Sequence, residues 1–149
     1  MASITFKQYY LRTKAVFYLE KWIGHFYLWA GDDPSGFDCS GLILEVLQSV
    51  GLIKHGEDMT ADALYRKFKD SERKKGGTGY LVFWFTPYKD KAIHVEMMVD
   101  EYHTVGASGG GSKTKTIADA IKHNAFVKMR PVYYRGLNFK ICDPFAKEG

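Results

Sequence analysis

Cys39 is the residue of this chain best placed to act as a nucleophile. It follows the turn-forming segment 31–36 and opens an apolar stripe with a helical period. Asp38 can cap this helix, which places Cys39 in the first turn, where free N–H groups and the helix dipole favour a thiolate. The same N–H groups can hold an oxyanion beside the sulfur. The stripe comprises Cys39, Leu42, Ile43, Val46, Leu47 and Val50.

The alternative for Cys39 is structural. A lone cysteine on an apolar helix face is usually a small, buried core residue. A core cysteine, however, does not need a turn-rich segment before it, whereas a nucleophile at a helix N-terminus does. The position of Cys39 therefore favours nucleophilic chemistry.

A cysteine nucleophile needs a base, and His94 is the best candidate among five histidines. It interrupts an apolar strand pattern, and Glu96 follows two residues later on the same strand face. A helix-borne cysteine facing a strand-borne histidine would form a Cys–His pair across a helix–sheet contact. The alternative is that His94 and Glu96 lie on a solvated strand face. The remaining histidines are His25, His55, His103 and His123.

The elements that must position these residues change from helical to extended along the chain. Helical periodicity predicts helices over residues 8–23, 39–50 and 61–69, with Thr60 as N-cap of the third. The face of the first helix is expected to bury Leu11, Ala15, Tyr18, Leu19 and Trp22. Residues 71–79 are charged and glycine-rich, which predicts a flexible loop.

After Gly79 the pattern predicts strands over residues 80–85, 92–99, 102–106, 125–134 and 138–142, with a short helix over residues 116–122. On the strand 92–99, the odd residues from Ile93 to Val99 are expected to face the core. Helices followed by a strand meander indicate the α+β class, with helices packed against one antiparallel sheet.

The composition indicates a single folded domain and gives no sign of a nucleic-acid-binding, disulfide-rich, metal-binding or membrane-spanning protein. With 149 residues, of which 46% are hydrophobic, we expect a single folded domain over residues 1–149. A net charge of +4 with one short basic run, residues 73–75 beside glycines, indicates a solvated loop and gives no reason to expect a nucleic-acid partner. Two cysteines make no disulfide framework, and the absence of zinc-spaced ligands predicts neither metal nor cofactor. No apolar run reaches membrane-spanning length and no signal segment is visible, which predicts synthesis in the cytoplasm.

Three segments, in the correct order over most of residues 26–108, resemble the NlpC/P60 cysteine peptidases. Residues 26–42, FYLWAGDDPSGFDCSGL, resemble the family's nucleophile segment PYxWGGxxPxGFDCSGL. Residues 79–85, GYLVFWF, resemble its GDLVFF strand, and residues 94–108, HVEMMVDEYHTVGAS, resemble its HVGIYLGxGxFIHAS hairpin. The first segment is the most specific of the three.

The resemblance implies a papain-like α+β fold and hydrolysis of amide bonds in bacterial peptidoglycan stem peptides, commonly beside a D-glutamyl residue. It implies that Cys39 is the nucleophile and His94 the base. Tyr27 matches the tyrosine that lines the oxyanion region, and Asp38 and Ser40 match positions that hold the substrate's amino end.

The chain departs from the family pattern at three positions. Gly106 stands where the family has its third polar residue, often histidine; Tyr80 replaces the GDL aspartate, and Glu96 replaces a small residue. We expect Glu96 to orient His94 instead, because a carboxylate can hold the imidazole and stabilise its cation. A backbone carbonyl or a water molecule is the alternative.

Two other functions stay open at this point. The hairpin at Gly106 and residues 124–135 resemble short phage-encoded members of the family, which would reach the cell wall by other means than their own signal. Gly106 favours a catalytically weak or inactive structural module of a phage particle. An acyl or amide transferase could also use Cys39 and His94, with an amine in place of water. The sequence predicts neither the bond cleaved nor the oligomeric state.

Overall fold

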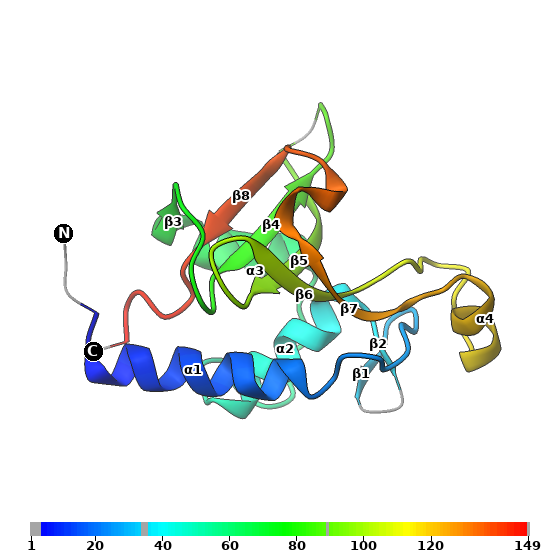
Figure 1. Ribbon diagram of the computed structural model, residues 1–149, viewed down its shortest axis with the longest axis horizontal. Helices are drawn as coiled ribbons and strands as arrows, with labels where there is room; N and C mark the ends of the chain where they lie inside the picture. Colours follow the sequence, from blue (N-terminus) through cyan, green and yellow to red (C-terminus); the bar gives the residue numbers. More distant parts are fainter. Residues whose placement is uncertain (1–3, 34–35, 89, 149) are drawn as a thin grey trace.

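The structure is a computed structural model that describes residues 4–33, 36–88 and 90–148. Its main sheet has the strand order β3-β8-β4-β5-β6-β7, with every neighbouring pair antiparallel. The strands β4 to β7 form the predicted meander, and β8 returns to lie between β3 and β4 (Figure 1). The strands are β3 (Glu72–Arg73), β4 (Leu81–Phe85), β5 (Ala92–Met98), β6 (His103–Ser108), β7 (Phe126–Pro131) and β8 (Phe139–Cys142).

Helices account for most of the remaining elements. They are α1 (Phe6–Glu20), α2 (Cys39–Ser49), α3 (Ala61–Phe68) and α4 (Ile117–Lys122), with the 3₁₀ turns η1 (Lys69–Ser71) and η2 (Val132–Arg135). A two-stranded ribbon, β1 (Asp32–Asp33) and β2 (Gly36–Phe37), precedes α2 and was not predicted. Among the described residues, no helix has both the length and the apolar composition needed to cross a bilayer.

The helix boundaries follow the capping residues. Asp38 accepts a hydrogen bond from the N–H of Gly41 at 2.7 Å, so α2 begins at Cys39 as predicted. Thr60 caps α3 in the same way. By contrast, α1 starts two residues before the predicted helix, because Thr5 and Gln8 form a capping box.

The main core lies between the sheet and α2, which packs against β5, β6 and α1. Leu42, Ile43, Val46 and Leu47 from the predicted stripe are fully buried there. They belong to the same apolar cluster as Phe83, Val95, Met97 and Val105 from the sheet. This packing holds the N-terminal turn of α2, and so Cys39, at a fixed position relative to β5.

The prediction for the two faces of β5 was partly wrong. Trp84 pairs with His94 and Phe85 with Ala92, so the register shifts and Ile93 is the extra residue. Ile93 is consequently 47% exposed instead of facing the core. The opposite face is covered as well, by a second apolar cluster of Val82, Trp84, Met98, Val132 and Ile141.

Two loop and strand boundaries also differ from the prediction. The predicted strand 125–134 ends at Pro131, which lacks a backbone donor, and the chain turns into η2. The predicted flexible loop 71–79 contains β3, whose Glu72 and Arg73 pair with Cys142 and Ile141 of β8. Backbone pairing therefore ties this segment to the edge of the sheet.

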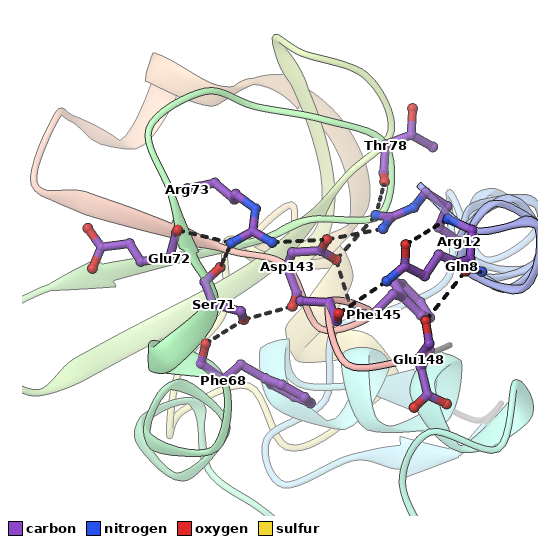
Figure 2. A network of polar contacts seen from close by, with 12 residues as sticks. Gln8, Arg12, Phe68, Ser71, Glu72, Arg73, Thr78, Asp143, Phe145 and Glu148 are labelled. Atoms are coloured by element: carbon purple, nitrogen blue, oxygen red, sulfur yellow. Dashed lines mark hydrogen bonds and ion pairs between the residues drawn. The ribbon is translucent and has the colours of Figure 1, made fainter. Parts of the chain in front are cut away.

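A buried ion pair joins α1 to the C-terminal segment (Figure 2). Arg12, only 5% exposed, donates to both carboxylate oxygens of Asp143 at 3.2 and 3.0 Å. Arg73 approaches the same carboxylate at 3.8 Å, and the Ser71 hydroxyl donates to the Asp143 carbonyl at 2.7 Å. The predicted apolar face of α1 was therefore incomplete, because it left out a buried arginine.

Candidate active site

A cleft of about 640 Å³ opens above the N-terminal turn of α2. Cys39 and His94 both line it, so the structure brings together the predicted nucleophile and base. Ala107 and Ser108 at the end of β6, and the glycines 109–111 that follow, form another part of its lining. The other four histidines lie outside this lining.

Cys39, His94 and Glu96 form a continuous polar chain. The Cys39 side chain lies close enough to the His94 ring for its hydrogen bonding to raise the pKa of His94. His94 Nε2 lies 2.7 Å from Glu96 Oε2. A carboxylate can only accept, so Nε2 carries the hydrogen of this bond, and Nδ1 is left to receive the Cys39 proton.

Interactions among Cys39, His94 and Glu96 favour the protonated form of His94 and the ionised form of Glu96. Burial lowers the pKa of His94, but hydrogen bonds to Cys39 and Glu96 and their negative charges outweigh it, so the net shift is upward. Burial raises the pKa of Glu96, but His94 and the hydroxyls of Tyr134 and Thr104 outweigh it, so the net shift is downward. Glu96 is therefore ionised and His94 binds a proton more readily than a free imidazole.

The solvated-face alternative for His94 and Glu96 is wrong. His94 is 4% exposed and Glu96 only 1%. Thr104 Oγ1 donates to Glu96 Oε1 at 2.7 Å, and the Tyr134 hydroxyl donates to Glu96 Oε2 at 2.5 Å. A carboxylate this deeply buried needs such partners to stay charged.

Thr104 and Tyr134 were not predicted as site residues. Thr104 shares a strand face with Gly106 in the predicted hairpin, so its place beside Glu96 could have been found from strand register. Tyr134 carried no such signal, because it comes from η2, where a strand was expected. Arg135, the last residue of η2, also lines the cleft and was not predicted, because it lies just beyond the predicted strand 125–134.

Tyr27 lies near Cys39, where its hydroxyl can act as a donor. It lines the cleft and is 7% exposed. A side chain at Gly110 would overlap its ring, since a Cβ there would lie 2.1 Å from Cδ1 of Tyr27. Burial, together with the charges of Cys39 and Asp38, raises the pKa of Tyr27. Its hydroxyl therefore keeps its proton.

Asp38 and Ser40 flank Cys39 in the lining of the cleft. Asp38 caps α2, and the Ser40 hydroxyl donates to its Oδ1 at 3.4 Å. Burial raises the pKa of Asp38, although the Gly41 N–H and the Ser40 hydroxyl partly offset this. Asp38 thus has a structural role at the start of α2 whether or not it also contacts a substrate.

Within the described ranges, no group of three or more histidine, cysteine, aspartate or glutamate side chains has an arrangement that could hold a metal ion. The polar atoms facing the cleft instead suit acid–base and nucleophilic chemistry. They include a thiol, an imidazole, a phenol and, toward the rim, the charged residues Asp58, Lys91 and Arg135.

Similar proteins are found by sequence. Residues 24–131 match the NlpC/P60 family. Protein P54 of Enterococcus faecium is 42% identical over 65 residues, a stretch that covers 43% of this chain but 12% of that protein.

Similar solved structures share the fold at low identity. The NlpC/P60 domain of the peptidoglycan hydrolase SagA superposes with a TM-score of 0.61 at 23% identity, covering 87% of this chain and 97% of that one. The peptidoglycan hydrolase RipB of Mycobacterium tuberculosis gives a TM-score of 0.61 at 18% identity, covering 92% and 67%. The family match spans most of the chain, including Cys39, His94 and Glu96, and we conclude that this protein belongs to the NlpC/P60 family.

Proposed function

We propose that this protein is a cysteine peptidase that hydrolyses amide bonds in peptidoglycan stem peptides. The observation that carries the proposal is the series of polar side chains from Cys39 and His94, which line an open cleft, to the buried carboxylate of Glu96 behind them. A helix N-terminal cysteine with a histidine base, itself oriented by a third group, is the arrangement that nucleophilic acyl transfer requires.

The first half of the reaction forms a thioester. The Cys39 sulfur attacks the carbonyl carbon while His94 holds the thiol proton on Nδ1. The oxyanion that forms is stabilised by N–H groups at the start of α2 and by the Tyr27 hydroxyl. The carbon–nitrogen bond then breaks, and the imidazolium gives its proton to the leaving amine.

The second half releases the acid. His94 removes a proton from a water molecule, the resulting hydroxide attacks the thioester, and the carbon–sulfur bond breaks. The sulfur leaves as a thiolate, which re-forms the pair with protonated His94. Glu96 stabilises the imidazolium in both halves without accepting its proton.

The substrate class rests on the family and on the solved structures named as peptidoglycan hydrolases. Asp38 and Ser40 line the cleft on either side of Cys39, and this supports the proposal that they receive a substrate amine. Glu96 fills the space beside Gly106 and reaches His94, so Gly106 is no longer a reason to favour an inactive structural module.

The direct test is to incubate the protein with purified peptidoglycan from several bacterial sources and identify the released fragments by mass spectrometry. We expect stem-peptide fragments whose new carboxyl end carries the oxygen of water. Chelator should leave release unchanged, and prior alkylation of the thiol should stop it. Fragments joined to an added amine would indicate transfer instead, and no release from any wall would overturn the proposal.

Replacing Glu96 with glutamine tests its assignment as the residue that orients His94. Without the carboxylate the imidazolium is less stable, so the pKa of His94 should fall, and Cys39 alkylation by a neutral reagent should begin at higher pH. We expect kcat to fall on the order of 100-fold, because an amide no longer selects the correct tautomer.

The alternatives for Glu96 give different results. If Glu96 contacted a substrate amine, Glu96→Gln would mainly raise KM and leave the alkylation profile unchanged. An unchanged profile together with normal turnover would remove Glu96 from the site and make a backbone carbonyl or water the partner of His94.

A further inference from the structure

We infer that Tyr134 is a positioning residue of this site, and that it acts through Glu96. Its hydroxyl donates to Glu96 Oε2, the same oxygen that lies 2.7 Å from His94 Nε2. Thr104 holds the other oxygen at 2.7 Å, so both carboxylate oxygens have hydroxyl donors. The inference rests on the proposed thiol mechanism, but it concerns a residue outside the segment 24–131 that matches the family.

The backbone of β6 leaves room for this arrangement. A Cβ at Gly106 would lie 2.2 Å from Cγ and 2.5 Å from Cδ of Glu96, so the Glu96 side chain occupies the space that any other residue at 106 would need. Glu96 therefore lies flat over β6, between His94 on one side and η2 on the other. The absence of a side chain at Gly106 is therefore what makes room for Glu96. Tyr134 then donates a hydrogen bond to the carboxylate of Glu96.

Tyr134 is itself held in one orientation. Val132, two residues earlier, is buried in the second apolar cluster and donates its N–H to the Tyr102 carbonyl at 2.8 Å, which anchors η2. The Tyr134 ring contacts Trp84 edge-on at a centroid distance of 6.1 Å. Arg130 lies over the same ring, 5.2 Å from its centroid. A hydroxyl fixed in this way can restrict Glu96 without movement of its own.

The charges around this hydroxyl favour the same role. Burial raises the pKa of Tyr134 to about 12, with the charge of Glu96 adding to the effect and Arg135 opposing it. Tyr134 therefore remains a donor over the whole range in which the site would operate. Ser108, which lines the cleft, lies close enough to the Tyr134 hydroxyl for hydrogen bonding that partly offsets this rise in pKa. The titratable groups that respond to a change at Tyr134 are thus Glu96, His94 and, through His94, Cys39.

Tyr134→Phe removes the donor and keeps the ring, and Tyr133→Phe is the matched control. Tyr133 is the preceding residue of η2 and is 59% exposed. We expect Tyr134→Phe to lower kcat about tenfold or more with little change in KM, because a hydrogen bond to a charged group is lost. Without this donor Glu96 becomes a stronger acceptor for the imidazolium, so the pKa of His94 should rise and the onset of Cys39 alkylation should move to lower pH. Tyr133→Phe should change neither quantity.

A double variant separates positioning from a merely structural effect. In a Glu96→Gln background the partner of Tyr134 is already altered, so adding Tyr134→Phe should cost less than twofold in kcat and leave the alkylation profile in place. The inference would be overturned if Tyr134→Phe lowered kcat equally in the wild type and in Glu96→Gln. It would also be overturned if Tyr134→Phe alone kept the alkylation profile of the wild type. If Tyr134→Phe fails to fold, Thr104→Val removes the other donor and should shift the profile in the same direction.

Alkylation needs no peptide substrate, so the two proposals can fail separately. A shifted profile in Tyr134→Phe without any release of wall fragments by the wild type would support the positioning role and contradict the substrate class. Normal fragment release by the wild type, together with the same alkylation profile in the wild type and in Tyr134→Phe, would support the proposed function. It would contradict the positioning role of Tyr134.

Discussion

Replacing Cys39 with alanine should abolish turnover and leave the fold intact. The attacking atom is lost, and no other described side chain in the cleft lining is a thiol, so we expect a loss on the order of 10⁴-fold or more in kcat. Alanine is well tolerated in a helix, and the Asp38 cap bonds to Gly41 and does not involve the sulfur. Turnover on stem peptides and thermal unfolding followed by circular dichroism would measure the two effects.

Cys142 provides the matched control, because it is the second free cysteine and lies in β8. It is fully buried, and burial raises the pKa of Cys142 to about 12, so its thiol is unreactive at neutral pH. Cys142→Ala should keep near-normal kcat and lose only some stability. Near-normal hydrolysis by Cys39→Ala, or lost hydrolysis by a folded Cys142→Ala, would contradict the assignment of the nucleophile.

The position of Cys39 at the start of α2 could be predicted because its signals are local. The turn segment, the Asp38 cap and the apolar stripe all lie within residues 31–50, and each acts through neighbours in sequence. The same holds for the Thr60 cap and for the alternation that placed His94 and Glu96 on one strand face. These patterns depend on helix and strand periods and not on the tertiary structure.

The features that could not be predicted from the sequence depend on contacts between segments that are far apart in the chain. The solvated alternative for Glu96 stayed open because its partner Tyr134 is 38 residues away, on a turn that begins only after Pro131. The exposure of Ile93 comes from a register shift against β4, which no pattern within β5 reveals. In each case the sequence shows a polar or apolar residue, and only the fold shows what covers it.

Arg12 is the clearest example of this kind, and it leads to the largest expected change in stability. Asp143→Ala should lower the free energy of unfolding by about 3–5 kcal/mol, because it leaves a buried guanidinium without its counter-charge. Arg12 and Asp143 are 131 residues apart, and both side chains are at most 6% exposed. The carboxylate also accepts from the Phe145 N–H at 2.9 Å, so its loss loosens the C-terminal segment.

Asp62 offers a control in which a carboxylate also binds an arginine and a backbone N–H, but the arginine is exposed. It pairs with Arg66 at 3.0 Å, the distance between Arg12 and Asp143, and accepts from the Ala92 N–H at 3.0 Å. The Arg66 side chain is 51% exposed, so water can solvate it when the partner is lost. Asp62→Ala should therefore cost only about 1–2 kcal/mol.

Urea unfolding of the two variants would compare them directly. Adding Arg12→Met to Asp143→Ala removes the unpaired charge and keeps an apolar side chain against Tyr80 and Phe145, so the double variant should regain part of the lost stability. A loss in Asp143→Ala no larger than in Asp62→Ala would mean that water reaches Arg12 once the carboxylate is gone. Further loss in the double variant would show that Arg12 stabilises the fold mainly through its cation–π contacts and not through the ion pair.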